Sequence, residues 1–161
     1  MPHLHMSVLS VKGTADSIRK ILKLLRLTKP NTAVFVPATP STLQMLKRVE
    51  PYIAYGFPTL KTVRDLVYKH GQGRVGDKAV TLTDNALIEK ELGEHNVICI
   101  EDIVHEIATV GESFRAVNRF LQPFKLKRPT ERWKNERKKF VEDDELGFSA
   151  EKINEVIERM S

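Results

Sequence analysis

The stretch TAVFVPATPSTLQMLKRVEPYIAYG, residues 32–56, decides the fold, because it predicts a strand, a helix and a further strand in close succession. TAVFVP is rich in β-branched residues and ends at a proline, as strands often do. The next segment begins with Thr39 before a proline, which is a typical capped helix start, and it turns Leu43, Leu46 and Val49 inward. PYIAYG then predicts a short extended segment.

The residues before this stretch predict another strand and another helix. LHMSVLSV, residues 4–11, alternates weakly between apolar and polar side chains, which favours a strand. TADSIRKILKLLRL, residues 14–27, predicts a helix, and its apolar residues share one stripe: Ile18, Ile21, Leu22 and Leu25. Strand, helix, strand, helix and strand in this order predict an α+β fold with one small sheet covered by helices.

The second half of the chain is mostly helical by its apolar spacing and its capping residues. Helices are predicted over residues 58–71, 82–93, 101–111, 112–122 and 149–161. Two short strands are predicted as well, DKAV at residues 77–80 continuing to Leu82 and a buried NVICI at residues 96–100. We therefore divide the chain into a βαβαβ core at 1–57, a mostly helical extension packed on it at 58–126, and a basic, then acidic tail at 127–161 that ends in an amphipathic helix.

Charge is arranged in blocks, although the net charge is only +5. Residues 1–78 hold 13 Lys and Arg against 4 Asp and Glu, and residues 79–124 hold 3 against 8. Residues 125–139 hold 8 against 2, and residues 140–161 hold 2 against 7. Such blocks are either solvated faces or surfaces that let one side of the protein meet phosphate while another side meets water or a basic partner.

The composition argues against a membrane protein and against a secreted protein. The chain has no apolar run approaching the roughly 18 residues of a membrane helix, and its first residues do not resemble a secretion signal. The single cysteine, Cys99, can form no internal disulfide and is expected to pack as a small buried hydrophobe. These features predict an intracellular protein.

The sequence offers no convincing catalytic centre. HEIAT, residues 105–109, differs by one residue from the zinc-protease helix motif H-E-x-x-H, since Thr109 stands where the second histidine is needed. No serine lies in a nucleophile elbow, and Cys99 lies in an apolar run that would leave it inert. Asp102 and its acidic neighbours are explained as favourable charges in the first turn of a helix. We expect no enzyme activity, no metal and no cofactor.

KHGQGRVGDK, residues 69–78, contains glycines spaced as G-x-G-x-x-G. A dinucleotide-binding turn would need a strand before it and a helix directly after it, but the apolar pattern predicts a helix that ends at Gly71 and a strand that follows. Three interpretations remain for this segment. It is a flexible solvated connection, a loop whose glycines let the backbone approach the phosphates of a polyanion, or, as the least favoured of the three, the nucleotide site of an enzyme.

Three basic patches form the candidate binding surface, since arginine grips phosphate oxygens with a rigid fork and lysine acts as a mobile point charge. The first helix contributes Arg19, Lys20, Lys23 and Arg26. The glycine loop contributes Lys69, His70, Arg74 and Lys78. The third patch contributes Lys125, Lys127, Arg128, Arg132, Trp133, Lys134, Arg137, Lys138 and Lys139. Trp133 either stacks on an unpaired base or anchors the tail to the domain. Structured RNA fits these patches better than DNA, because no DNA-groove helix module or zinc finger is apparent.

Five segments in order resemble the family of large-ribosomal-subunit proteins whose bacterial member is called L-thirty and whose eukaryotic member is called L-seven. They are RKILKLLRL, VEPYIAYGFPTLKTVRDLVYKHGQGRV, LTDNALIEKELG, VICIEDIVHEI and FLQPFKL. The resemblance implies a ferredoxin-like βαβαβ core with a three-stranded antiparallel sheet and an added C-terminal helical region. It also implies binding to large-subunit ribosomal RNA and to neighbouring ribosomal proteins in the cytoplasm, with passage through the nucleolus if the source is eukaryotic.

In the family that this chain resembles, the first helix, the turn before it and the loop matching YKHGQGR lie toward RNA. The resemblance therefore adds Lys12, in the turn before the helix, to the candidate residues. Eukaryotic members usually begin with a long basic arm, whereas this chain begins close to its first predicted strand. GESFRAVNRFLQPFKL resembles a paralogue that acts in nucleolar ribosome assembly about as well as it resembles the mature subunit protein. The closing segment, residues 140–160, favours the mature protein.

Overall fold

A computed structural model describes residues 2–7, 14–127, 147–148 and 152–161 of the chain. A five-stranded sheet lies at its centre, with the strand order β6-β2-β1-β3-β7. The strands are β1 (Pro2–Ser7), β2 (Thr32–Pro37), β3 (Ile53–Gly56), β6 (Phe124–Lys125) and β7 (Gly147–Phe148). Strand β1 pairs antiparallel with both β2 and β3, β6 pairs antiparallel with β2, and β7 pairs parallel with β3.

The predicted α+β class is therefore confirmed, but the sheet has five strands where three were expected. Strands β6 and β7 have two residues each, and so short a segment carries no alternation that a sequence could display. Both join the sheet at its edges, so segments from beyond residue 57 complete the sheet that the first 57 residues begin.

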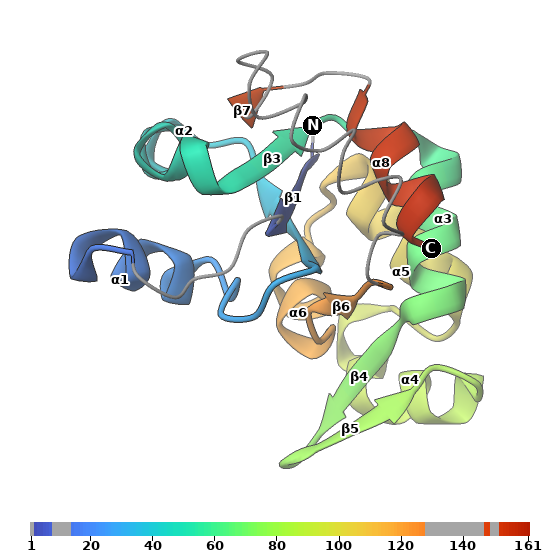
Figure 1. The fold of residues 1–161 in the computed structure, drawn as a ribbon. Helices are drawn as coiled ribbons and strands as arrows, with labels where there is room; N and C mark the ends of the chain where they lie inside the picture. The colour runs from blue at the N-terminus through green and yellow to red at the C-terminus, as the bar shows by residue number, and fades with distance from the viewer. Residues whose placement is uncertain (1, 8–13, 128–146, 149–151) are drawn as a thin grey trace.

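Two helices, α1 (Asp16–Leu24) and α2 (Pro40–Val49), cover one face of this sheet (Figure 1). Successive residues of a strand point to opposite faces, and on this face Val34, Ile53 and Tyr55 are buried. They form one core with apolar residues of the two helices and of the turn after α1: Leu22, Leu25, Leu27, Leu46 and Val49.

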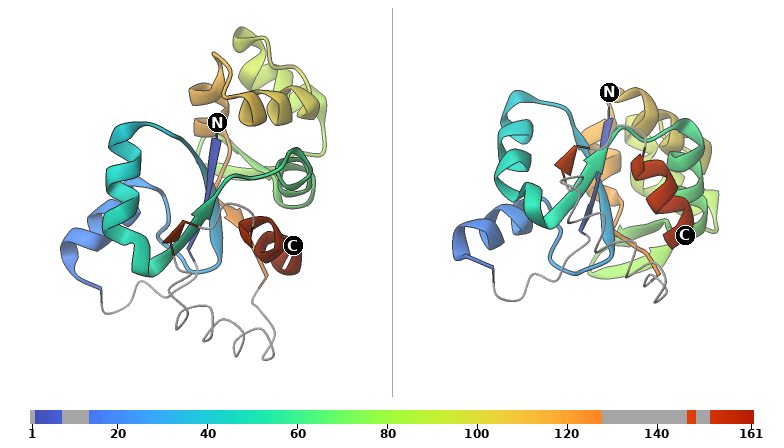
Figure 2. Two further views of the ribbon diagram at one scale, coloured as in Figure 1. Left: turned by 90° about the horizontal axis from the view of Figure 1, so that it is seen from above. Right: turned by 45° about the horizontal axis from the view of Figure 1, so that its top comes forward.

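The opposite face carries a larger core. The intervening strand residues Ala33, Phe35 and Ala54 belong to it, and the Phe35 ring meets the Phe124 ring edge to face at 5.4 Å. Four helices pack there, on the side away from α1 and α2 (Figure 2): α3 (Leu60–His70), α5 (Ile100–Thr109), α6 (Phe114–Phe120) and α8 (Lys152–Met160). A fifth helix, α4 (Asn85–Leu92), contributes Ile88 and Leu92 to the same core. Helices thus cover both faces, which explains why β2 and β3 are almost continuously apolar rather than alternating.

A two-stranded hairpin with an adjoining helix extends from one end of this body (Figure 1). The hairpin consists of β4 (Gln72–Val75) and β5 (Lys78–Thr81), and helix α4 (Asn85–Leu92) follows it. The prediction of a loop here is therefore wrong in form, because residues 69–70 end α3 and residues 72–75 and 78 are paired strand. Gly76 forms the turn with a φ of 60°, and Gly73 lies so close to the Phe120 ring that a Cβ there would come within 2.2 Å of it. The glycines serve packing and turning.

Several local predictions have clear outcomes. Thr39 caps α2 as expected, and its side chain accepts a hydrogen bond from the Thr42 amide. The strand predicted at NVICI is wrong, because Ile100 begins α5 and the Asp102 carboxylate accepts hydrogen bonds from the amides of Ile98 and Cys99 just before it. This helix start leaves Cys99 half-buried rather than buried. Two short 3-10 helices, Glu50–Tyr52 and Gly93–His95, complete the described elements.

Apolar faces were predicted well where helices are amphipathic. In α6 the residues Phe114, Val117 and Phe120 share one face and are all buried. In α2, Leu43 is 37% exposed, although it was predicted to face inward. It lies in the first turn of the helix, where the chain has not yet reached the core.

Candidate nucleic-acid interface

The basic helix α1 ends earlier than its sequence suggested. Arg19, Lys20 and Lys23 are exposed on it, and Arg19 lies 3.6 Å from the carboxylate of Asp16. The helix ends at Leu24, so Arg26 is not a member of the helical strip with which it was grouped. Arg26 instead occupies the left-handed backbone region with a φ of 61°, which turns the chain back toward the sheet.

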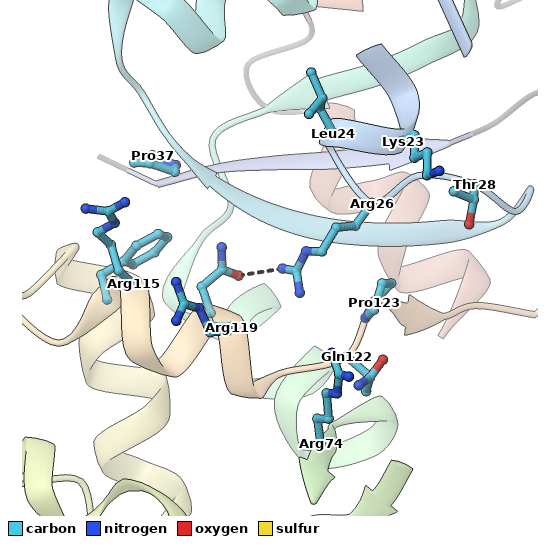
Figure 3. A pocket seen from close by; sticks show the side chains of 12 residues that line it. Lys23, Leu24, Arg26, Thr28, Pro37, Arg74, Arg115, Arg119, Gln122 and Pro123 are labelled. Carbon is cyan, nitrogen blue, oxygen red and sulfur yellow. Dashed lines mark hydrogen bonds between the residues drawn. The ribbon is translucent and has the colours of Figure 1, made fainter. Parts of the chain in front are cut away.

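The Arg26 side chain crosses to helix α6 and is half-buried there. Its guanidinium donates to the carbonyl oxygen of Leu121 at 2.9 Å. It also donates to Oδ1 of Asn118 at 3.1 Å (Figure 3). Asn118 in turn donates through Nδ2 to the carbonyl oxygen of Phe35 at 3.0 Å. Burial lowers the pKa of Arg26, but an arginine remains charged at neutral pH. Arg26 therefore holds three elements together while keeping a positive charge at their junction.

A groove of about 720 Å³ opens at this junction. The end of α1 and the turn after it form one wall, α6 forms another, and Arg74 of the hairpin and Gln122 close the third (Figure 3). Five of the residues that line it are basic: Lys23, Arg26, Arg74, Arg115 and Arg119. We call this site the basic groove.

None of the described residues that line the basic groove is acidic. Asp77 lies 3.7 Å from the Arg74 guanidinium, but both side chains are exposed there, and exposed ion pairs neutralise little. Five cations that line one hollow repel one another. A polyanion in the groove would remove this repulsion, so the arrangement favours phosphate binding.

A second hollow of about 260 Å³ adjoins the basic groove and shares Arg26, Thr28, Gln122 and Pro123 with it. Lys29 and Lys125 line this second hollow. Lys125 was predicted from the third basic patch, and β6 carries it to the sheet edge beside β2. The structure thus brings together residues from all three predicted patches: Lys23 and Arg26, Arg74, and Lys125.

Other predicted residues lie away from the groove. Lys69 lines a small hollow between α3 and α8. His70 ends α3, and its pKa is lowered by burial and by the nearby charges of Lys127 and Lys69. A histidine with a lowered pKa is largely neutral at pH 7 and contributes little charge to phosphate binding. Lys78 is exposed beside the hairpin turn.

Lys127 is exposed two residues after β6, and the other predicted residues lie outside the described part of the chain. These are Lys12, Arg128, Arg132, Trp133, Lys134, Arg137, Lys138 and Lys139. Both interpretations of Trp133 therefore stay open.

Sequence reasoning missed three cations of this surface, Arg115, Arg119 and Lys29. Arg115 and Arg119 are four residues apart, so they lie on the same side of α6. This spacing in FRAVNRF was a readable signal, but the segment stands in a block of net negative charge. Adding up charges over long segments therefore concealed the local basic face of α6.

Three sequence hypotheses concern other chemistry. His105 is exposed on α5, and among the described residues no three His, Cys, Asp or Glu side chains gather as a metal site would require. Glu106 accepts a hydrogen bond from the Ser113 amide at 3.2 Å, and Asp102 caps α5, so both have structural roles. Across the described ranges, no helix combines the length and apolar character needed to cross a membrane.

Comparison with known proteins gives two findings. A sequence profile of the family described as ribosomal protein L30p/L7e matches residues 7–53. A curated protein of Neurospora crassa, large ribosomal subunit protein uL30, is 49% identical over 144 residues, which is 89% of this chain. The chain spans 58% of the length of that relative.

Proposed function

Because this chain belongs to the ribosomal protein L30p/L7e family, we propose that it is a structural component of the large ribosomal subunit and binds large-subunit ribosomal RNA through the basic groove. The observation that carries this proposal is the groove itself, with five basic and no acidic residues among those that line it. Each neutralised phosphate releases counterions, so several such contacts give strong binding that weakens with salt.

The scaffold acts by holding cations in place and performs no catalysis in this proposal. In this proposal the β1-α1-β2-α2-β3 unit is the scaffold, and the elements after residue 57 add α6 and the hairpin that complete the groove. The partners are large-subunit ribosomal RNA and neighbouring ribosomal proteins. The site of action is the cytoplasmic ribosome, reached through the nucleolus during assembly in a eukaryote.

A binding measurement with two RNAs tests this function. The full chain is titrated against transcribed large-subunit ribosomal RNA and, as the matched control, transcribed small-subunit ribosomal RNA. We expect tighter binding to the large-subunit RNA, with an affinity that falls steeply as salt rises. Equal binding to both RNAs at physiological salt would contradict the assignment to the large subunit.

Sedimentation of a cell extract then separates a mature component from an assembly factor. A mature component is expected in polysomes as well as in free large subunits. Presence in precursor particles combined with absence from polysomes would favour the assembly factor.

A further inference from the structure

The basic groove differs from a purely electrostatic surface because apolar groups stand among its cations. Leu24 is 73% exposed, and it lines the groove together with Pro37 and Pro123. Phosphate contact needs no apolar wall. A ligand with both an apolar face and a negative charge would use all of these groups.

The arginines of the groove suit a flat aromatic ligand. Arg115 and Arg119 are both exposed, lie one helical turn apart on α6 and line the same hollow. A guanidinium is planar and stacks on aromatic faces, whereas a lysine ammonium does not. Nucleic-acid bases present such faces only when they are unpaired, because a duplex keeps them inside its stack.

The floor of the groove is fixed before any ligand arrives. Arg26 is hydrogen-bonded to Leu121 and Asn118, and Asn118 is hydrogen-bonded to Phe35 in β2. A site whose polar groups are already held in place binds with less loss of conformational entropy. Its volume of about 720 Å³ is within the range of roughly 300–1,000 Å³ that is typical of pockets for small organic molecules, so a nucleotide-sized group fits.

We propose that the basic groove is a site for an unpaired RNA nucleotide, whose base lies against Leu24 and the guanidinium planes of α6 and whose phosphates meet the surrounding cations. The neighbouring hollow with Lys29 and Lys125 continues the positive track, so the strand that carries this nucleotide leaves the groove along it. This inference rests on the proposed RNA-binding function and specifies what the groove receives.

The test uses substitutions that change shape but conserve charge. Arg115→Lys with Arg119→Lys keeps both positive charges and removes both guanidinium planes. Arg48→Lys with Arg64→Lys makes the same change on α2 and α3, outside the groove, and serves as the matched control. Each full-length variant is titrated with a fluorescent single-stranded oligoribonucleotide and with the same oligoribonucleotide annealed into a duplex. All four substituted arginines are exposed, so circular dichroism is expected to show an unchanged fold.

We expect the groove variant to bind the single strand about tenfold more weakly, because it loses the stacking of a base on a guanidinium plane, and to bind the duplex as the wild type does. The control variant is expected to bind both probes normally. Equal losses for single strand and duplex, or no loss for either, would overturn the inference. Both of those outcomes leave the proposed function intact, since that function is tested separately by the preference of the wild type for large-subunit ribosomal RNA.

A second variant examines the apolar wall without touching any charge. Leu24→Ala removes most of an exposed side chain. It is expected to weaken single-strand binding a few-fold while the salt dependence of binding stays the same, because every cation that meets phosphate is kept. An unchanged single-strand affinity would contradict the placement of the base against Leu24.

Discussion

The Arg26 bridge gives the sharpest structural prediction. Arg26→Ala removes the hydrogen bonds to the Leu121 carbonyl and to Asn118. Hydrogen bonds from a charged donor contribute about 1.5–3 kcal/mol each, but the alanine variant also avoids the cost of partly burying the guanidinium. We therefore expect a net loss of about 2 kcal/mol in the free energy of unfolding. For a chain of this size the midpoint of thermal unfolding then falls by about 4–8 °C.

A glycine at the same position separates the contribution of the hydrogen bonds to stability from the contribution of the backbone conformation. Arg26 has a φ of 61°, and this region costs a non-glycine residue about 1–2 kcal/mol. Arg26→Gly loses the same hydrogen bonds as Arg26→Ala but is relieved of this cost. We expect the glycine variant to be about 1 kcal/mol more stable than the alanine variant.

Denaturant unfolding of the full chain measures these differences, with Lys20→Ala as the control because Lys20 is exposed on α1. The control is expected to change stability by less than about 0.5 kcal/mol. A double-mutant cycle between Arg26→Ala and Asn118→Ala isolates their direct coupling, expected to exceed about 0.5 kcal/mol. The reasoning is refuted if Arg26→Ala is as stable as the Lys20 control, or if the two substitutions are additive.

Further predictions concern the hairpin and the start of α5. Gly73→Ala is expected to cost about 3 kcal/mol of unfolding free energy, because the new Cβ would overlap the buried Phe120 ring. Gly76→Ala has open space around it and is expected to cost only about 1 kcal/mol for its positive φ; a larger loss for Gly76 in denaturant unfolding would contradict this order. The Ile98 amide lowers the pKa of Asp102, so the cap stabilises the fold above the unfolded-state pKa of about 3.9 and this contribution is lost as pH falls through the lower folded-state pKa. Asp102→Asn is therefore expected to lower the free energy of unfolding by about 1 kcal/mol at pH 7 and to leave it unchanged below the folded-state pKa of Asp102. A stability difference between wild type and variant that does not depend on pH would argue against the charged cap.

The sequence predicts the helices and the central strands because their periodicity reflects which faces are buried. The apolar stripe of 14–27 and the β-branched run of TAVFVP both correspond to elements of the sheet and of its first helical layer. Failures occur where the deciding contact is distant in sequence. Strand β6 forms because Phe124 and Lys125 pair with β2, and nothing in two residues indicates that pairing.

The candidate site was likewise predicted only where its signal is local in the sequence. A positive strip on α1 is visible in the sequence, but the groove depends on a turn at Arg26 that aims its side chain at Asn118, about 90 residues later. The glycines of the hairpin resembled a phosphate loop because tight turns and close packing use the same residue type. The contact of Gly73 with the Phe120 ring shows that this glycine is needed for close packing, and the sequence does not display that contact.

The salt dependence of binding tests the central claim most directly. Lys23→Gln, Arg115→Gln and Arg119→Gln together remove three groove charges, and Lys47→Gln with Arg48→Gln removes charge from the exposed end of α2 as the control. Affinity for large-subunit ribosomal RNA is measured over a range of salt concentrations. The logarithm of the affinity is expected to fall less steeply with the logarithm of salt, by roughly 0.7–0.9 for each phosphate that the variant no longer neutralises, and the control is expected to keep the wild-type slope. A groove variant with the wild-type slope and affinity would contradict the account.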